Sequence, residues 1–520
     1  MPTDAAQPSR KMARKSVEAL QRDAGSTGLK RTLGPWNLML LGIGCILGAG
    51  IYVMTGTAAA NFAGPAVMLS FVIAGVACGL TALCYAELAS ALPVSGSSYS
   101  YAYASIGEVF AWALGWLLML EYGLAGSLLA VGFAGYFGSL LHDFGVVIPA
   151  VLASPTLQAV GHGSALIVHP GINLVAVGAV AAVSVILTLG VSESATVNNV
   201  LVLIKISVLV AFVAVGVGAV HPHNWTPFIP RNEGGFTYGW QGVVRAASIL
   251  FFAYLGFETV STAAAETRNP QKDMPFGILG ALGACTIIYI IVAAVLTGVV
   301  PFRELGVADP IALAADRMGQ PQMATLIKLG ALMGLSSVLL VNCYGQSRIG
   351  FAMSRDGLLP QLFGRLHKRF RTPWQGILLL GAISAVMAAV FPISLLGDLV
   401  SLGTALAFMI VSICLMWLRS TRPDLERPFK VPFGGMQIGR VWIGLVPVAA
   451  ILACVVMILP VGIDIVGQAL AGHVVPAVFL GSYAVAGALV YVFYGRRRAR
   501  TMGDPAIAAA EIISVGKAAS

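Results

Sequence analysis

An uncharged stretch between Thr32 and Ala86 constrains the fold more than any other feature of the sequence. A membrane-spanning helix needs about 20 mostly apolar residues, so this stretch can hold two such helices. The cluster from Asn61 to Pro65 divides it, because glycine and proline favour turns. The rest of the chain has the same character, since 58% of all residues are hydrophobic and 10% are charged, against about 25% charged residues in soluble proteins. The sequence therefore predicts an integral membrane protein.

The remaining apolar runs are also of helix length, which argues against a membrane barrel of alternating strands of about ten residues. The sequence predicts an all-α integral membrane protein with twelve transmembrane helices. The predicted spans cover residues 36–60, 66–91, 108–139, 171–191, 195–219, 241–265, 276–300, 322–353, 374–391, 395–418, 441–460 and 474–494. Residues 1–35 are polar and lack the apolar core of a cleavable signal peptide.

Basic residues indicate the orientation of these spans, since Lys and Arg concentrate in cytoplasmic segments. With both termini in the cytoplasm, the predicted inside segments hold 24 of the 31 Lys and Arg residues, and the outside segments hold four. We therefore expect a multi-pass protein of the cell (inner or plasma) membrane. The net charge of +9 indicates this topology and contact with anionic lipid rather than a nucleic-acid partner.

The sequence lacks the residue patterns that are typical of metal, cofactor, enzyme and ATP-binding sites. The seven cysteines lie singly without CxxC spacing, and the seven histidines fall in loop-like sequence, so we expect no metal and no other cofactor. Acids and histidines do not cluster as they do in a membrane enzyme, and no enzyme activity is expected. There is no G-x-x-x-x-G-K-[ST] sequence, so ATP is not an expected partner.

Two segments are expected to interrupt helices inside the membrane. Residues 42–50 of the first span hold four glycines, among them Gly44 and Gly48, and each glycine weakens a helix by about 1 kcal/mol relative to alanine. Five spans later, Gly256 precedes the carboxylate of Glu258. Broken helices at equivalent positions of two inverted repeats are typical of secondary transporters, whose freed backbone groups bind the substrate. Close helix packing by small residues is the alternative for the first motif.

The electrostatics of such breaks favour an amino acid as the substrate. Backbone N–H groups at the start of a half-helix attract a carboxylate, while carbonyls freed at the end of one accept hydrogen bonds from an ammonium group. A zwitterion satisfies both sets at once, whereas a sugar or a hydrophobic drug does not need this arrangement.

Eight segments carry a resemblance to a known family. They are Leu29–Trp36, the glycine motif of residues 42–51, Tyr85–Ala89, Glu258–Pro275, Gly345–Ile349, Ala352–Pro360, Asp398–Gly403 and Arg422–Pro432. These segments resemble the cationic amino acid transporter family of the amino acid–polyamine–organocation (APC) superfamily, in its bacterial twelve-span form. The resemblance implies a ten-helix core of two inverted repeats of five helices, with helices 1 and 6 discontinuous, followed by helices 11 and 12.

The expected division of the chain and the expected site follow from this resemblance. The segments are a cytoplasmic N-terminal tail (1–35), the first repeat with spans 1–5 (36–219), an outside loop (220–240), the second repeat with spans 6–10 (241–418), a loop with spans 11 and 12 (419–494) and a cytoplasmic C-terminal tail (495–520). The implied contacts are Ile46, Ala49 and Gly50 for the substrate carboxylate, the carbonyls of Phe252, Ala253 and Leu255 for its amino group, and Met333 for its side chain.

Three ionisable residues lie within predicted spans and are candidates for ion coupling: Lys205, Glu258 and Glu121. A charge in mid-membrane costs about 3 kcal/mol or more, so it needs a partner or a task. Lys205 lies about 15 Å from the cytoplasmic start of its span, and burial disfavours the charged form of a lysine. We expect Lys205 to bridge to the broken part of span one and to couple its protonation to the opening of the site. The alternatives are a permanently charged tether between helices, or a sodium ion held by the hydroxyls of Ser336 and Ser337.

These observations predict a secondary transporter that moves amino acids by alternating access, with proton-coupled symport as the first expectation. Exchange of one amino acid or amine for another on the same fold is the alternative. The expected partners are a neutral or cationic amino acid, the proton and the lipid bilayer.

Overall fold

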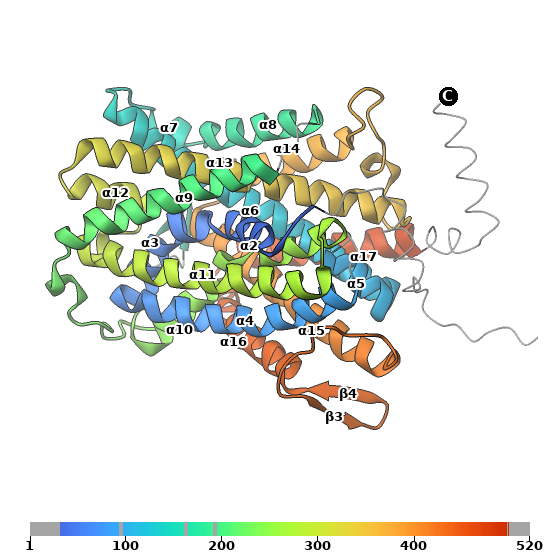
Figure 1. The fold of residues 1–520 in the computed structure, drawn as a ribbon. Coiled ribbons are helices and arrows are strands. Elements are labelled where there is room, and N and C mark those ends of the chain that lie inside the picture. Colours follow the sequence, from blue (N-terminus) through green and yellow to red (C-terminus); the bar gives the residue numbers. More distant parts are fainter. Residues whose placement is uncertain (1–31, 93–96, 161–164, 191–194, 497, 499–520) are drawn as a thin grey trace, which may run out of the picture.

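The computed structural model describes residues 32–92, 97–160, 165–190, 195–496 and 498, which form a bundle of long helices (Figure 1). The helices are α2 (Pro35–Ile46), α3 (Thr55–Ala58), α4 (Val67–Ala91), α5 (Ser97–Ser105), α6 (Glu108–Asp143), α7 (Ala150–Ala153), α8 (Leu174–Thr188), α9 (Ala195–Gly216), α10 (Gly239–Leu250), α11 (Pro270–Val299), α12 (Pro310–Arg317), α13 (Pro321–Arg355), α14 (Trp374–Val390), α15 (Ile393–Thr421), α16 (Leu445–Leu470) and α17 (Val475–Val490). The short 3-10 and π segments are η1 (Gly50–Met54), η2 (Ala59–Ala63), η3 (Gly64–Ala66), η4 (Val217–Ala219), η5 (Pro222–Trp225), η6 (Phe251–Tyr254), η7 (Phe257–Glu266), η8 (Phe302–Glu304), η9 (Gln361–Phe363) and η10 (Tyr491–Gly495). Two antiparallel hairpins pair β1 (Leu157–Val160) with β2 (Ala165–Val168) and β3 (Gly435–Ile438) with β4 (Val441–Gly444).

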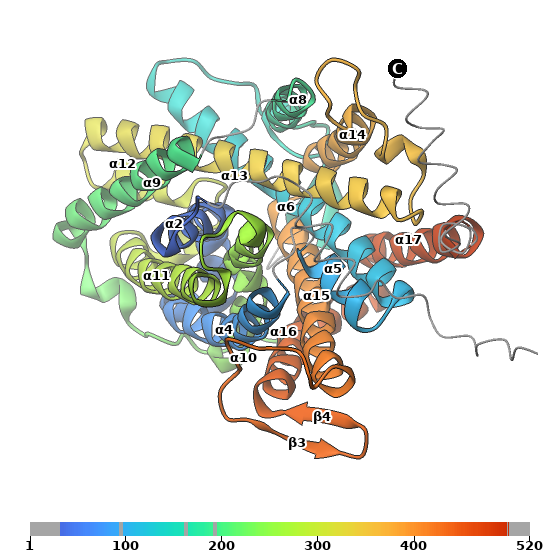
Figure 2. The same ribbon diagram turned by 45° about the vertical axis from the view of Figure 1, so that its right-hand side comes forward.

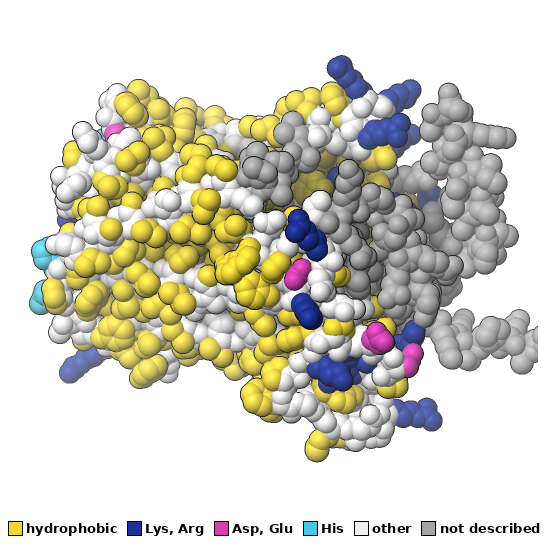
Figure 3. Space-filling view, viewed as in Figure 1, with side chains coloured by type: hydrophobic (Ala, Val, Ile, Leu, Met, Phe, Trp, Pro, Cys, Tyr) yellow, Lys and Arg dark blue, Asp and Glu magenta, His cyan; other side chains and the backbone are white. Residues whose placement is uncertain are grey.

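The described helices have the length and the surface of membrane spans. Among the described residues, nine helical runs are long and apolar enough to cross a membrane, and the longest, Pro35–Ala91, covers the first two predicted spans. Two shorter apolar helices, α8 and α14, cover two further predicted spans. Large apolar side chains face outward, and Val76, Ile287 and Val386 are each more than 60% exposed. Figure 3 shows this apolar surface over the middle of the molecule, with most Lys and Arg towards one end. The chain is therefore an all-α, multi-pass membrane protein.

The predicted division of the first apolar stretch is confirmed at Gly64. This residue has a φ of +61°, a backbone conformation that favours glycine. A Cβ atom here would lie 2.6 Å from the ring of Pro230. The turn thus combines a backbone angle and a close approach that only glycine meets, and α4 begins three residues later at Val67.

Two features of the fold differ from the expectation. The helix α16 ends at Leu470 rather than at residue 460, since it continues through Pro460 and past Asp464, whose carboxylate lies 2.6 Å from the Nε of Arg245. The β1–β2 and β3–β4 hairpins were not predicted. Each lies in a connection between helices, where four-residue strands give too short a pattern to detect. The strand β4 occupies residues 441–444 of the span predicted over 441–460, so α16 begins later, at Leu445.

Helices that are distant in sequence pack side by side in the core. The helix α2 packs against α11, α9 and η7, and α4 packs against α11 and α10. Figure 2 shows α2, α11 and α4 next to one another. The chain just before α2 is also fixed, because Leu33 forms a parallel β-bridge with Thr267 at the end of η7. Its N–H lies 3.1 Å from the carbonyl of Glu266, and its own carbonyl accepts the N–H of Arg268 at 2.9 Å.

Candidate substrate site at two helix breaks

The first span is interrupted after Ile46. Leu47 caps α2 with ψ at 87°, outside the helical range, and the regular π turn η1 starts at Gly50. The unwound residues therefore include Gly48, one of the glycines from which the sequence predicted the break. This position also requires a small residue, because a Cβ atom on Gly48 would lie 3.1 Å from Val338 of α13 and 3.4 Å from Leu129 of α6.

The second break lies at Leu255 and Gly256. The 3-10 turn η6 ends at Tyr254, Leu255 is extended with ψ at 133°, and Gly256 has a φ of +123°. Any side chain at Gly256 would be strained, because L-residues rarely adopt this backbone conformation. The helix then resumes as η7.

The two breaks touch each other through their backbones. A Cβ atom on Gly50 would lie 2.6 Å from the Cα of Ala253, and one on Gly256 would lie 2.7 Å from the carbonyl carbon of Cys45. The glycines of the first span therefore serve both of the roles considered for them, since they allow the helix to unwind and they allow close approach. Ile46, Ala49, Gly50, Phe252, Ala253 and Leu255 are all buried at this contact.

Tyr289 of α11 joins the carbonyls that the two breaks set free. Its hydroxyl oxygen lies 2.7 Å from the carbonyl oxygen of Ile46 and 2.9 Å from that of Ala253. These carbonyls come from different helices, and each belongs to a residue predicted to bind the substrate. Sequence reasoning missed Tyr289, because a tyrosine in an apolar helix has no pattern that separates it from a core residue.

Lys205 of α9 reaches the end of α2, as the sequence predicted. Its Nζ donates a hydrogen bond of 2.9 Å to the carbonyl of Gly44, and the side chain is 1% exposed. A Cβ atom on Gly334 of α13 would lie 3.5 Å from the Lys205 stem. The lysine thus lies between α2, α9 and α13, beside the first break.

Glu258 caps the second break instead of facing open space. Its Oε2 accepts the N–H of Gly256 at 2.8 Å, and its Oε1 accepts the hydroxyl of Tyr122 at 3.3 Å. A carboxylate is favoured there, because the start of a helical segment leaves N–H groups unpaired. The N–H at this end of η7 is therefore already taken by the protein's own carboxylate.

Glu121 of α6 is fully buried and only half satisfied. Its Oε1 accepts the hydroxyl of Thr404 of α15 at 3.0 Å, so this carboxylate joins two helices. Its Oε2 has no hydrogen-bond partner among the described residues. Since a buried polar atom without a partner is costly, this oxygen is a candidate acceptor for a ligand.

The structure does not bring Met333 to the breaks. Its side chain is 42% exposed, on the same face of α13 as Leu326 (58%) and Leu329 (43%). The next residue, Gly334, is the one that faces Tyr52 and Lys205. Neighbouring helix positions differ by about 100° in direction, so a placement that is wrong by one residue moves the side chain to the outer face.

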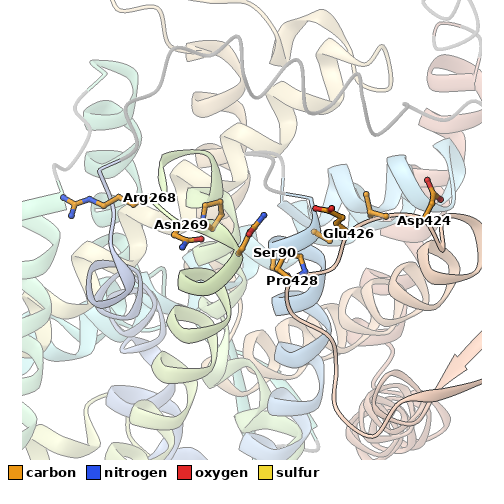
Figure 4. A pocket seen from close by; sticks show the side chains of 10 residues that line it. Ser90, Arg268, Asn269, Asp424, Glu426 and Pro428 are labelled. Carbon is orange, nitrogen blue, oxygen red and sulfur yellow. The ribbon is translucent and has the colours of Figure 1, made fainter.

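A pocket of about 530 Å³ lies away from the breaks, at the end of the bundle where α4 ends and α11 begins (Figure 4). It is lined by Ser90, Ala91, Arg268, Asn269, Pro270, Gln271, Asp424, Leu425, Glu426 and Pro428. The residues at the breaks are buried, so the candidate site is closed in this structure.

An apolar helical bundle with two broken helices in contact is typical of membrane transport proteins. The amino acid permease family model matches residues 33–493, and the chain belongs to this family of APC-type amino acid transporters. The resemblance found in the sequence is thereby confirmed.

Named relatives cover most of the chain. It is 45% identical to the methylthioribose transporter of Bacillus subtilis (strain 168), over 81% of this chain and 88% of that protein. It is 43% identical to the branched-chain amino acid permease BcaP of the same organism, over 86% of this chain and 92% of the permease. It is 36% identical to the vacuolar cationic amino acid transporter 4 of Arabidopsis thaliana, over 79% of this chain and 66% of that protein.

Replacing Tyr289 by phenylalanine should lower substrate uptake by about tenfold. The change leaves two buried carbonyls without their common hydroxyl, at a cost of about 1–3 kcal/mol for each group that stays unpaired. Uptake per folded protein and thermal stability would be measured together. The control is Tyr483→Phe, which removes a 2.7 Å hydrogen bond to the carbonyl of Trp116 on α6, far from the breaks in sequence. Equal uptake by the two variants would contradict a role of Tyr289 at the site.

Proposed function

We propose that this chain is a secondary amino acid transporter that works by alternating access, with twelve spans arranged as two inverted repeats of five helices and two further helices. Its breaks lie five spans apart, which supports this arrangement. Helix pairs with the same separation lie side by side, namely α4 with α11, α6 with α13 and α8 with α14. In the proposed orientation both termini are cytoplasmic, and the breaks lie near the middle of the bilayer.

The observation that carries this proposal is the meeting of two freed carbonyls, those of Ile46 and Ala253, at one hydroxyl. A substrate ammonium would bind these acceptors, so Ile46, which the resemblance assigned to the carboxylate, is proposed to contact the ammonium group instead. The carboxylate would lie at the start of η1, next to Gly48 and Gly50. Backbone groups at the ends of half-helices supply opposite partial charges at these two places. The arrangement fits the two charged groups of an amino acid.

Proton coupling is proposed to act through Lys205. A protonated lysine donates to Gly44 and holds α2 against α9, whereas a deprotonated lysine loses this charge-assisted contact. The position of α2 at the break would thus depend on the proton. The sodium alternative has less support, because the ammonium group of Lys205, which donates to the carbonyl of Gly44 beside the first break, would compete electrostatically with the ion. Exchange of amino acids or amines on the same fold is the second candidate.

Neutral amino acids, or a broad range that includes basic ones, are the proposed substrates. The side chains against Gly48 are those of Leu129 and Val338, which are apolar. The free oxygen of Glu121 would accept a basic group if one entered. One relative is named for branched-chain amino acids, which are neutral, and another for cationic amino acids, so the names of the relatives include both kinds of substrate.

The test is uptake into proteoliposomes that contain the purified protein. Each of the twenty amino acids and methylthioribose would be supplied, with and without an inward proton gradient and with and without sodium. We expect accumulation of amino acids that depends on the proton gradient and not on sodium. Protein-free vesicles are the control, and counterflow in the absence of net uptake would favour exchange. Transport of methylthioribose alone would contradict the proposal, since a neutral sugar has neither the ammonium nor the carboxylate on which it depends.

A further inference from the structure

Arg245 is the centre of a buried charge cluster that the site does not use. The residue lies in α10 and is 2% exposed. Its Nη1 and Nη2 donate to both carboxylate oxygens of Asp398 at 2.8 and 2.7 Å, and its Nε donates to Asp464 at 2.6 Å. The guanidinium also lies 4.6 Å from the ring centre of Phe62. A fork-like contact of this kind is strong and directional.

The cluster joins four elements at one end of the bundle. Arg245 belongs to the half of helix 6 that precedes its break, and Phe62 belongs to η2, in the half of helix 1 that follows its break. Asp398 lies in the first turns of α15, and Asp464 lies in α16, outside the proposed repeats. In the proposed orientation this is the outer side of the membrane, opposite to the contact of Leu33 with Thr267.

The helices are tightly packed between this cluster and the breaks. A Cβ atom on Gly397, next to Asp398, would lie 2.6 Å from the Cε of Met54 in η1 and 3.3 Å from Ile249 in α10. Met54 is fully buried. A substrate that comes from this side can reach the breaks only if η1 or α10 moves away from α15.

We propose that Arg245, Asp398 and Asp464 form a latch that holds the outer halves of helices 1 and 6 closed, and that α16 is part of this latch. The inference rests on the proposed alternating access. When α10 separates from α15 and α16, all three hydrogen bonds of Arg245 to Asp398 and Asp464 are broken. Each opening of the outer side therefore leaves a buried guanidinium without its partners. Loss of a partner destabilises a buried pair strongly. The latch therefore favours the closed state, and α16 has a role in gating.

The experiment measures outer opening directly, with Met54→Cys as the reporter. The seven native cysteines are buried, and the protein without Met54→Cys gives the background. A membrane-impermeant maleimide is added outside intact cells, and the labelling rate is followed. Asp398→Asn and Asp464→Asn keep the side-chain size and remove one charge each. We expect each to raise the labelling rate of Met54→Cys at least threefold, and Asp398→Asn to have the larger effect because the asparagine amide has one oxygen for the two N–H groups of Arg245 and turns an NH2 group towards the other.

The matched control is Glu233→Gln, which removes the exposed ion pair of Glu233 with Arg303 at the same end of the molecule and should leave the rate unchanged. If Asp398→Asn fails to fold, Arg245→Lys keeps the charge without the fork and should also speed labelling. Rates equal to the control in all three variants would overturn the latch. If Asp398→Asn raises the labelling rate and Asp464→Asn does not, the role of α16 in the latch is overturned. Labelling needs no substrate, so it stays informative even if the uptake test contradicts amino acid transport.

Discussion

Replacing Lys205 by methionine is expected to abolish accumulation driven by a proton gradient. Methionine keeps the length and the apolar character of the stem, so the packing against Gly334 is largely retained. The change removes the group that can bind a proton and the hydrogen bond to Gly44. Uptake with the gradient should fall to the level measured without it, a loss of about tenfold or more. The measurement is uptake into proteoliposomes at equal and at unequal pH.

The matched control for Lys205 is Lys328→Met. Lys328 is also 1% exposed and lies within a span, but it is paired with Asp143 at 2.8 Å and with Asp316 at 3.0 Å. Its removal leaves two carboxylates without their partner and should lower stability, while the response of uptake to the gradient is kept. An unchanged gradient response in Lys205→Met would refute the coupling role and leave the lysine as a tether between helices.

Replacing Gly50 by alanine is expected to reduce transport to the background. The added methyl group would lie 2.3 Å from the Cβ and 2.6 Å from the Cα of Ala253, so the backbone of one broken helix must move. Overpacking of this kind costs about 1–3 kcal/mol, and here the shift falls on the atoms proposed to bind the substrate. Substrate binding to purified protein and uptake would both be measured.

Gly178→Ala is the control for this substitution. Gly178 lies in α8, and a Cβ atom there meets nothing within 4 Å. Alanine favours a helix over glycine by about 1 kcal/mol, so this variant should be at least as stable as the parent protein and fully active. Normal uptake by Gly50→Ala would mean that the contact between the breaks can relax, and that the closed geometry described above is not needed for binding.

The sequence predicted the features that rest on composition and on glycine. Apolar runs located the helices, and the glycines around Gly48 and Gly256 located both breaks, because backbone freedom is a local property. Lys205 was also found from sequence, since a charge in an apolar run needs a partner, although its acceptor at Gly44 required coordinates. The coupling role proposed for Lys205 stays a prediction.

The features that could not be predicted from the sequence depend on the direction in which a side chain points from its helix and on contacts between residues far apart in the chain. Tyr289 lies far from Ile46 in the chain, and no pattern links a hydroxyl to a carbonyl of another helix. Met333 was assigned to the wrong face of α13 because no motif fixed the rotation of that helix. The span predicted to end at residue 460 continues to Leu470, with Pro460 inside α16 and Asp464 paired with Arg245, a contact between distant parts of the chain.

The β-bridge between Leu33 and Thr267 links the N-terminal segment to the residue that follows η7. If η7 moves during a transport cycle, the segment must either move with it or lose its three backbone hydrogen bonds with Glu266 and Arg268. A fusion tag or a bound protein upstream of this point would then slow the movement of η7. A change at the start of the chain would thus lower the transport rate without altering the residues of the candidate substrate site.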